Sequence, residues 1–245
     1  MEGKTALVTG GARRVGAAIA RHLHAAGARV LIHYRDSEAD AVALVKALNA
    51  VRAASAAAVK ADLLAPVAPR ALIGAAMSAF GRLDLLVNNA SSFYPVKVGA
   101  IEASHWEELM GSNLRAPLFL SQAAAPELRK TQGVIINIID IHAELPMKNH
   151  VVYNVAKGGL LALTRSLARE LGPQVRVNGV SPGTVLWPED AAWQNDIERQ
   201  RIVNQTLLKR TGEPDDIAMA VEFLMTAPYV TGQILAVDGG RSIAL

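Results

Sequence analysis

The chain has 245 residues, a length at which an α/β protein commonly forms one domain, and we expect a single domain over residues 1–245. Hydrophobic residues make up 51% of the chain and charged residues 19%, which excludes an intrinsically disordered protein. The net charge is +3 without a long basic run, so we expect no nucleic-acid partner. The absence of cysteine excludes disulfides, and the six histidines show no metal-ligand spacing, so we expect no metal.

Two observations bear on where the protein is found. The first strand-like run begins at Thr5, which leaves no room ahead of it for a signal or transit segment. No apolar stretch approaches the roughly 18 residues that a membrane-spanning helix needs. We therefore expect a cytoplasmic protein that does not associate with a membrane.

Short β-branched runs alternate with longer amphipathic stretches along the whole chain. The runs predicted as strands are residues 5–9, 29–33, 57–61, 83–88, 134–139, 175–180 and 233–238. The stretches predicted as helices are residues 15–26, 40–53, 66–80, 104–129, 151–171 and 214–225. The segment 183–208 begins without a clear pattern and becomes helical after residue 195. Such a segment is typical of a functional lid or a disordered loop, and we assign it to the substrate.

The predicted strands are continuous apolar runs, which is typical of a parallel sheet covered by helices on both faces. Seven such strands alternating with six helices predict an α/β, doubly wound, seven-stranded parallel sheet. Right-handed connections then give the strand order 3-2-1-4-5-6-7. Because ligands of such sheets bind at the carboxyl ends of the strands, we expect the site at that edge.

The segment LVTGGARRVGAAIA places Gly10, Gly11 and Gly16 between the first strand and the first helix. Glycines at this point let the backbone approach a pyrophosphate, while the helix N-terminus directs its free N–H groups and its positive dipole end at it. A tight turn also needs glycine when no ligand is present, so the motif alone leaves both interpretations open. Its position between a strand and a helix favours a dinucleotide site.

The end of the second predicted strand bears on the choice of nicotinamide cofactor. An acidic residue there favours the ribose hydroxyl of NADH, whereas an arginine favours the 2′-phosphate of NADPH. Tyr34 and Arg35 occupy this point, and Arg13 is expected beside them across the neighbouring strand. Asp36 would repel a phosphate, so we expect it to face solvent or, like Ser37, to lie at the cap of the next helix. The sequence therefore predicts NADPH.

Tyr153 and Lys157 are four residues apart in a predicted helix, so their side chains lie on one face. An ammonium beside a phenol stabilises the phenolate, and a pKa lowered by about 3 units, or about 4 kcal/mol, would allow proton transfer near neutrality. The spacing alone also fits an amphipathic helix with a tyrosine at the edge of the core and a solvated lysine.

These features resemble the short-chain dehydrogenase/reductase family over nearly the whole chain, which implies a Rossmann-type fold. The matching segments, in chain order, are TGGARRVG (9–16), ADL (61–63), NNA (88–90), Asn113 in SNLRAP, Tyr153 with Lys157, SPG (181–183) and VDGGRSI (237–243). By this resemblance Tyr153 donates a proton, Lys157 holds the nicotinamide ribose and lowers the tyrosine pKa, and Asn113 anchors a proton-relay water.

The resemblance also implies which residues contact the cofactor. They are Gly10, Arg13, Arg14, Val15, Tyr34, Arg35, Ser37, Asp62, Leu63, Asn89, Ala90, Tyr153, Lys157, Pro182 and Gly183. For Asp62 the sequence leaves two roles open, because an aspartate after the third strand either contacts the adenine or caps the next turn.

Two residues depart from the family pattern. Arg14 stands where the family's glycine turn, TGxxxGxG, has its middle glycine, and Asp140 stands thirteen residues before the tyrosine, where the family has a serine that donates to a substrate carbonyl. A carboxylate opposes the alkoxide formed in ketone reduction, so Asp140 argues against that reaction. It fits a nitrogen-rich substrate, or a C=N bond whose nitrogen needs a proton that a buried aspartate would relay. Alternatively, Asp140 caps the turn after the fifth strand.

Both departures occur together in the pteridine reductases, which use NADPH to reduce dihydropterins or folates. The segment NNASSFYP (88–95) is similar to their loop after the fourth strand, where Phe93 would stack on the pterin and Ser91 would bind it. Arg14 would reach both the cofactor phosphate and the substrate.

A second segment, SPGTVLWPE (181–189), is similar to the bacterial pteridine reductases, with Leu186 and Trp187 as an apolar wall. The resemblance implies the following substrate-binding residues: Arg14, Ser91, Phe93, Asp140, Tyr153, Leu186 and Trp187. The catalytic residues that it implies are Asn113, Asp140, Tyr153 and Lys157.

The sequence thus predicts an NADPH-dependent pteridine reductase acting on a dihydropterin, a pterin or a folate. Three alternatives stay open, namely a dihydromonapterin or dihydrofolate reductase using the same site, a carbonyl reductase of the 3-oxoacyl or sugar type, and a non-catalytic NADPH-binding sensor. A sensor would not need the pair of Tyr153 and Lys157, and both are present. The resemblance further implies a homotetramer in which the helices over residues 104–129 and 151–171 pack between subunits.

Overall fold

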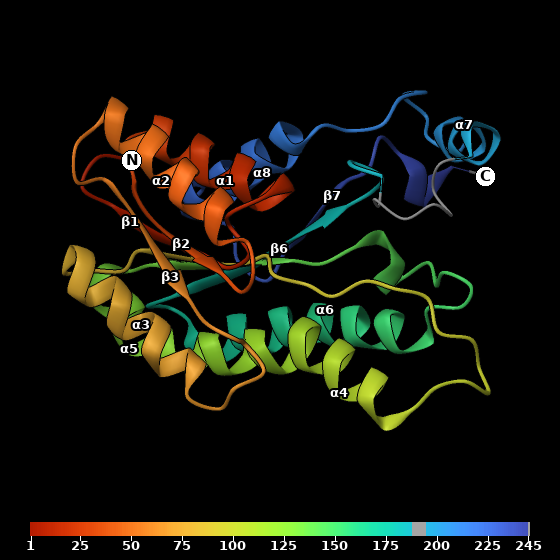
Figure 1. The fold of residues 1–245 in the computed structure, drawn as a ribbon, viewed down its shortest axis with the longest axis horizontal. Helices are drawn as coiled ribbons and strands as arrows, with labels where there is room; N and C mark the ends of the chain where they lie inside the picture. The colour runs from red at the N-terminus through yellow and green to blue at the C-terminus, as the bar shows by residue number, and fades with distance from the viewer. Residues whose placement is uncertain (188–194, 245) are drawn as a thin grey trace.

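The computed structural model describes residues 1–187 and 195–244, which form one parallel sheet between two layers of helices (Figure 1). Its strands are β1 (Thr5–Val8), β2 (Arg29–Tyr34), β3 (Ala56–Lys60), β4 (Leu85–Asn88), β5 (Val134–Ile138), β6 (Arg176–Pro182) and β7 (Ile234–Val237). The strand order β3-β2-β1-β4-β5-β6-β7 confirms the predicted topology. Strand β1 pairs with β2 on one side and with β4 on the other. The helical connections on the two sides of β1 therefore run in opposite directions, and a crevice opens between them at the carboxyl ends of the strands.

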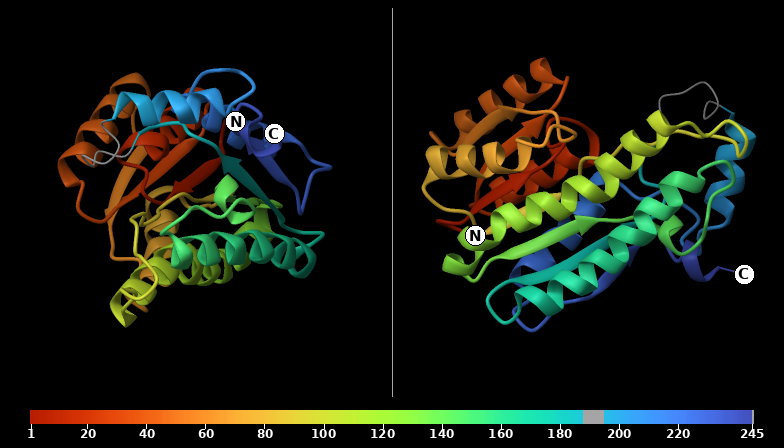
Figure 2. Two further views of the ribbon diagram at one scale, coloured as in Figure 1. Left: turned by 90° about the vertical axis from the view of Figure 1, so that its right-hand side faces the viewer. Right: turned by 90° about the horizontal axis from the view of Figure 1, so that it is seen from below.

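Helices cover both faces of the sheet (Figures 1 and 2). One layer contains α1 (Arg14–Ala25), α2 (Glu38–Val51) and α8 (Pro214–Thr226). The other contains α3 (Ala68–Phe80), α4 (Ala103–Met110), α5 (Ala116–Thr131) and α6 (Val151–Leu171). A further helix, α7 (Asp196–Asn204), lies near the C-terminus. None of the helices in the described parts of the chain has both the length and the apolar character that crossing a bilayer would require.

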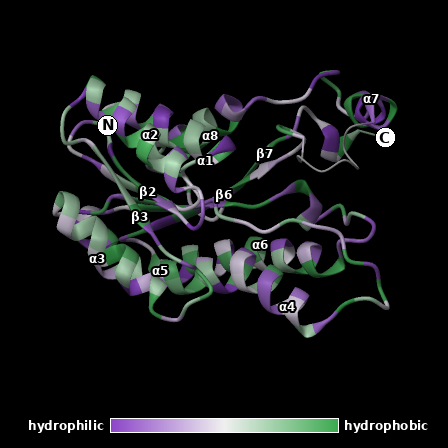
Figure 3. Cartoon of the chain, in the orientation of Figure 1, coloured by the Kyte–Doolittle hydropathy of each residue, from purple (hydrophilic) through white to green (hydrophobic). Residues whose placement is uncertain are grey.

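Alternate residues of each strand point to opposite faces and build two hydrophobic cores. Ala6 and Val8 pack in the core beneath α1, α2 and α8, whereas Leu7 between them packs in the core beneath α3, α5 and α6. All three side chains are fully buried, and burial of one leucine stabilises the fold by about 1.5–3 kcal/mol. Hydrophobic residues accordingly run through both helix layers in Figure 3, whereas α7 is largely hydrophilic.

The helix predicted over residues 104–129 is interrupted in the structure. A π-helical segment, η1 (Gly111–Arg115), separates α4 from α5. Pro117 explains the interruption, because it has no N–H to donate to the carbonyl of Asn113 four residues earlier. The amphipathic pattern continues through the segment, so hydrophobic spacing alone did not reveal it.

The helical part of the segment 183–208 is also shorter than predicted. Helix α7 ends at Asn204, and not near Leu208. The Thr206 hydroxyl donates to the Val203 carbonyl at 2.8 Å and Lys209 Nζ donates to the Asn204 carbonyl at 2.7 Å, which satisfies carbonyls that the helix end leaves free. Residues 188–194 of this segment lie outside the described residues.

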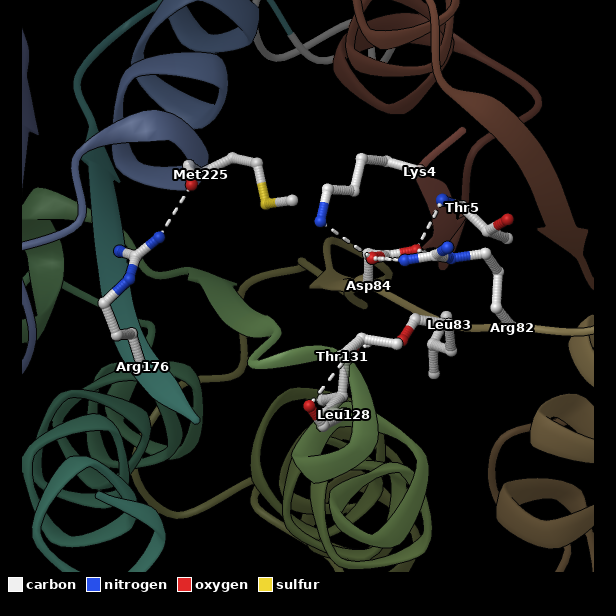
Figure 4. Close-up of polar contacts among 9 residues, drawn as sticks. All are labelled: Lys4, Thr5, Arg82, Leu83, Asp84, Leu128, Thr131, Arg176 and Met225. Atoms are coloured by element: carbon white, nitrogen blue, oxygen red, sulfur yellow. Dashed lines mark hydrogen bonds and ion pairs between the residues drawn. The ribbon is translucent and has the colours of Figure 1, made fainter. Parts of the chain in front are cut away.

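The amino ends of the strands are joined by a buried carboxylate, at the edge of the sheet opposite the crevice (Figure 4). Asp84, just before β4, is fully buried and accepts hydrogen bonds from the Thr5 N–H at 2.9 Å and from Arg82 Nε at 2.8 Å. Lys4 Nζ lies 3.2 Å from its second oxygen. This cluster ties β1 to β4 at the end of the molecule that does not carry the site.

Candidate active site

A cavity of ≈ 1140 Å³ lies at the carboxyl ends of the strands. Its wall consists of the segments that follow β1 to β6, the first part of α6, residues of α7 with Gln205 after it, and Arg241 after β7. All residues predicted from the sequence to bind cofactor or substrate, or to take part in catalysis, line this cavity, with the exception of Asn113. The sheet therefore brings these residues together at the edge where they were expected.

The glycine turn after β1 is fixed to the end of β4. Thr9 Oγ1 accepts hydrogen bonds from the N–H groups of Asn89 and Ala90 at 2.9 and 3.0 Å, and Asn89 Nδ2 donates to the Thr9 and Gly10 carbonyls at 2.9 and 3.1 Å. A Cβ on Gly16 would lie 2.1 Å from the Gly10 carbonyl oxygen, so a glycine is required where α1 meets the turn. The N-terminus of α1 is thereby held at the cavity, where its free N–H groups favour an anion.

His33, which the sequence interpretation did not single out, holds the same turn from the side of β2. Its Nδ1 accepts the Gly10 N–H at 3.1 Å and its Nε2 lies 3.1 Å from the Ala61 carbonyl. These partners require the neutral tautomer with the proton on Nε2. Burial lowers the pKa of His33, although the Ala61 carbonyl and the charge of Asp62 oppose the shift. The neutral form is therefore retained at neutral pH.

Arg14 adopts a backbone conformation that favours glycine. Its φ is 51°, in the left-handed region, which for a residue with a side chain costs about 1–3 kcal/mol. Its guanidinium donates from Nη2 to the Trp187 carbonyl at 3.0 Å and lies 3.4 Å from the Leu186 carbonyl. The side chain thus joins the glycine turn to the segment after β6, across the cavity.

The basic residues expected at the ribose phosphate are paired with carboxylates. Arg35 Nε donates to Asp36 Oδ2 at 2.7 Å, and Arg13 Nε lies 3.7 Å from Asp40 Oδ2 in the first turn of α2. The Arg35 and Asp36 side chains are 55% and 76% exposed, so the pair is solvated. Asp36 therefore faces solvent, which is one of the two roles that the sequence left open.

Two further polar residues of the wall have local roles. Asp62 Oδ1 accepts the Leu64 N–H at 2.9 Å and so caps the turn after β3, the second of its two predicted roles. Ser37 precedes α2, but its side chain makes no capping hydrogen bond within the described structure. Both residues line the cavity, so either can still contact a bound ligand.

Asp140 contacts the tyrosine and also caps a turn. It follows β5, and its Oδ1 accepts the His142 N–H at 2.9 Å at the start of the short helix η2 (Ile141–Ala143). Its Oδ2 accepts a hydrogen bond of 2.7 Å from the Tyr153 hydroxyl. One carboxylate oxygen thus caps the turn, which is one of the two roles that the sequence left open, and the other oxygen contacts the Tyr153 hydroxyl.

Lys157 lies one helical turn after Tyr153 and is fully buried in α6. Its Nζ donates to the Ile138 carbonyl at 2.9 Å and lies 5.7 Å from the centre of the Tyr153 ring. Burial lowers the pKa of Lys157 to about 8, and the negative charge of Asp140 opposes this shift. At neutral pH most of the lysine remains an ammonium.

The prediction that Lys157 lowers the pKa of Tyr153 is wrong for this structure. Burial raises the pKa of Tyr153 well above its usual value, and the charge of Asp140 and the hydrogen bond to it raise it further. The Lys157 ammonium lies over the Tyr153 ring and donates to a backbone carbonyl, whereas the Tyr153 hydroxyl contacts the Asp140 carboxylate. Loss of the hydroxyl proton would place a negative phenolate next to this carboxylate and is therefore unfavourable. Tyr153 therefore keeps its proton at neutral pH.

An aromatic cluster forms the wall beside the tyrosine. Phe93 stacks on His150 with ring centres 4.8 Å apart and meets Tyr153 edge to face at 4.9 Å. His150 Nδ1 lies 2.8 Å from the Lys148 carbonyl, which fixes the plane of the imidazole ring. His150 was not predicted as a site residue, because its place depends on the fold of the loop before α6.

Asn113 lies behind this wall. Its Nδ2 donates to the Ser92 and Leu109 carbonyls, both at 2.9 Å, and its Oδ1 is buried without a hydrogen-bond partner among the described residues. The Ser92 N–H in turn lies 3.3 Å from Ser112 Oγ. The π-helical segment therefore fixes the loop that carries Ser91 and Phe93.

The outer wall is built from the segment after β6, α7 and the C-terminal turn. Leu186 is exposed, and the Trp187 ring lies 5.5 Å from the Arg199 guanidinium of α7. Arg201 and Arg241 also line the cavity and were not predicted as site residues. Arg241 stands within the matching segment VDGGRSI, but nothing in that pattern indicates that its side chain reaches the site.

Comparison with known proteins agrees with this geometry. The chain belongs to the short-chain dehydrogenase/reductase family, since the family described as enoyl-(acyl carrier protein) reductase matches residues 10–242. It is 38% identical to pteridine reductase 1 of Leishmania tarentolae, covering 97% of this chain and 96% of the relative. It is 33% identical to a 3-oxoacyl-(acyl-carrier-protein) reductase of Staphylococcus aureus, covering 97% of both.

A solved structure is similar over nearly the whole fold. This is a blue fluorescent protein from a metagenomic library in complex with NADPH, with a TM-score of 0.91, 37% identity and coverage of 98% of both chains. The protein is therefore an oxidoreductase of this family, and its relatives include both pteridine and 3-oxoacyl reductases.

Proposed function

We propose that the protein is an NADPH-dependent pteridine reductase that reduces a dihydropterin or a related pterin, with Tyr153 and Asp140 handling protons. The observation that carries the proposal is the 2.7 Å hydrogen bond from the Tyr153 hydroxyl to Asp140 Oδ2 inside the cavity. A carboxylate at this point can accept N–H groups and hold a proton, and it disfavours the anion that forms on a ketone oxygen.

The residues of the wall fit NADPH. The glycine turn and the N-terminus of α1 offer N–H groups to a pyrophosphate. Gly10 lines the cavity with a φ of 59° and has no side chain, so a pyrophosphate can approach its backbone. Arg35 and Arg13 stand beside Tyr34 at the end of β2, where a 2′-phosphate would be bound. Lys157 and the Asn89–Ala90 backbone would hold the nicotinamide ribose and ring. When bound, the nicotinamide supplies the hydride.

The protein supplies the proton that accompanies this hydride. Reduction of a C=N bond adds the hydride at carbon and a proton at nitrogen. Tyr153 keeps its proton because its pKa is raised, and Asp140 Oδ2 provides a second position for a proton next to it. The pair therefore acts as one unit that takes a proton from solvent and passes it to the substrate nitrogen. The Lys157 ammonium offsets the negative charge of the carboxylate.

Phe93 supports an aromatic substrate in this position. One of its faces rests on His150, and the ring lies beside Tyr153 in the cavity wall. A flat pterin ring placed against such a side chain gains stacking energy on the order of 0.5–1.5 kcal/mol beyond its burial. Ser91, in the same loop, would bind the edge of the ring.

A carbonyl reductase is the second candidate, and the similarity to a 3-oxoacyl reductase favours it. The test monitors the oxidation of NADPH through the loss of its absorbance, with dihydrobiopterin, dihydrofolate or a 3-oxoacyl thioester as the substrate. We expect the wild-type protein to turn over the pterins and Tyr153→Phe to lose this turnover. Turnover of the thioester alone would overturn the proposal, and tight NADPH binding without any turnover would indicate a sensor.

The homotetramer is part of the same proposal. Trp106 of α4, Phe119 of α5 and Val155 of α6 are 47%, 46% and 51% exposed, and these helices are the ones expected to pack between subunits. Exposed apolar side chains on neighbouring helices are typical of a subunit interface. Light scattering coupled to size exclusion tests it, and a monomeric mass at micromolar concentration would contradict it.

A further inference from the structure

Arg241 places a guanidinium in the outer wall of the cavity. It begins the short helix η4 (Arg241–Ile243), which follows β7, and its side chain is half-buried between two other segments. Nη1 donates to Thr184 Oγ1 at 2.8 Å, in the segment after β6. Nη2 lies 3.3 Å from Gln205 Oε1, just beyond α7. All three residues line the cavity.

Within residues 1–187 and 195–244, no carboxylate pairs with the charge of Arg241. Both of its side-chain partners are neutral oxygens, and no carboxylate of the described residues forms an ion pair with it. Arg201, which lines the same wall, differs because its Nε lies 3.1 Å from Glu198 Oε2. A guanidinium that is partly removed from water without a counter-ion is unfavourable, and an anion bound beside it relieves that cost.

The nearby carboxylates are already engaged elsewhere. Asp140 accepts from Tyr153 and His142. Asp238 accepts from the backbone N–H groups of Gly240 and Ser242 at 2.9 and 2.7 Å. Burial lowers the pKa of Arg241, and the charges of Asp140 and Asp238 only partly oppose this. Arg241 and Asp140 line the same cavity.

We propose that Arg241 forms an anion subsite that binds a carboxylate on the substrate, on the α7 side of the cavity from Asp140 and Tyr153. This deepens the proposed function, on which it rests, by assigning the residue that would select pterins with an acidic tail, such as the glutamate of a folate, over pterins without one. The planar guanidinium suits a carboxylate, because it can offer two parallel N–H groups once Gln205 or Thr184 gives up its bond.

The test compares two substrates in the full-length protein saturated with NADPH. Dihydrofolate carries a glutamate tail, whereas dihydrobiopterin has an uncharged side chain. In Arg241→Gln the KM for dihydrofolate should rise by about tenfold or more, as expected for loss of one charge-assisted hydrogen bond. The KM for dihydrobiopterin should change by less than about twofold, and Arg241→Lys should restore part of the preference for dihydrofolate.

Controls separate a binding role from a structural one. Arg21→Gln removes an exposed arginine of α1 that lies outside the cavity and should leave both substrates unaffected. If Arg241→Gln impairs both pterins equally, the arginine is a tether between η4 and α7, and the proposal is overturned. A rise confined to the KM for NADPH would instead assign the arginine to the cofactor and would also overturn it.

A binding experiment keeps this proposal separate from the proposed reaction. Calorimetric titration of the NADPH-loaded protein with 4-aminobenzoylglutamate, which has the acidic tail but no pterin, should give binding that Arg241→Gln abolishes. If neither pterin is reduced but this binding is observed, the reductase assignment fails and the anion subsite stands. If the tail fragment does not bind to the wild-type protein, the anion subsite is overturned whatever the substrate proves to be.

Discussion

The hydroxyl of Tyr153 donates a 2.7 Å hydrogen bond to Asp140 Oδ2, while the other oxygen of the same carboxylate accepts the His142 N–H. The two contacts of Asp140 can therefore be separated by substitution. Asparagine retains an oxygen for the His142 N–H but cannot hold a proton in the way that a carboxylate does.

Asp140→Asn should lower kcat/KM for a dihydropterin by about 100-fold or more, as is typical when a proton-transfer group is lost. The dissociation constant for NADPH, measured by fluorescence titration, should change by less than about threefold. Asp140→Ser, which also loses the charge, should likewise depress pterin reduction more than NADPH binding. If Asp140→Asn retains full activity, the residue is only the cap of the turn.

The charge of Lys157 predicts how activity depends on pH. Its pKa is lowered to about 8, so the ammonium is present below this pH and is lost above it. If the ammonium holds the cofactor, kcat/KM for NADPH should fall as pH rises through about 8, because this parameter reports the free enzyme. Lys157→Arg, whose side chain stays charged, should show no such decline in its residual activity. A profile that is flat to about pH 10 would show that the charge of Lys157 is not required.

The ion pair between Arg35 and Asp36 bears on the choice between NADPH and NADH. Both side chains are largely solvated, and an exposed pair of this kind contributes only about 0–1 kcal/mol, so a phosphate can readily take the place of Asp36. Arg35→Ala should raise the KM for NADPH by about tenfold and leave the KM for NADH nearly unchanged. Asp36→Ala should lower the KM for NADPH by no more than about threefold. Equal effects of Arg35→Ala on the two cofactors would refute the assignment.

The parts of this structure that follow from local pattern could be predicted from the sequence. The sheet order depends on alternating strands and helices, and the position of the cavity depends on where parallel strands end. Tyr153 and Lys157 face the same way because of helical spacing. None of these conclusions needed the three-dimensional neighbours of a side chain.

The electrostatic character of the site could not be predicted in the same way. The raised pKa of Tyr153 follows from burial and from Asp140, thirteen residues away, and both depend on how β5 packs against α6. Arg14 has a positive φ, and the only feature of the sequence that bears on it is that the family's turn pattern has a glycine at this position. His33 and Arg241 make their hydrogen bonds to partners in distant segments of the chain, which no spacing in the sequence reveals.

Asp84 offers a test of stability that is independent of the active site, because it lies at the opposite edge of the sheet. Burial alone would raise its pKa, but hydrogen bonds from Arg82, the Thr5 N–H and Lys4 outweigh burial and lower it. A carboxyl group whose pKa is lower in the folded state stabilises the fold above its unfolded pKa of about 3.9, and this contribution is lost as pH falls through the folded value.

Asp84→Ala should therefore reduce the free energy of unfolding at neutral pH by about 1–3 kcal/mol, since it leaves the buried Thr5 N–H without its partner. Asp84→Asn keeps an acceptor for that N–H but has no charge to lose, so its stability should decline less on acidification below about pH 4 than that of the wild-type protein.

Urea unfolding over this pH range measures both effects. Lys130→Gln, which removes an exposed ion pair with Glu127, is the matched control and should change stability by less than about 0.5 kcal/mol. Identical acid profiles for Asp84→Asn and the wild-type protein would show that the buried carboxylate does not set the acid stability of the fold.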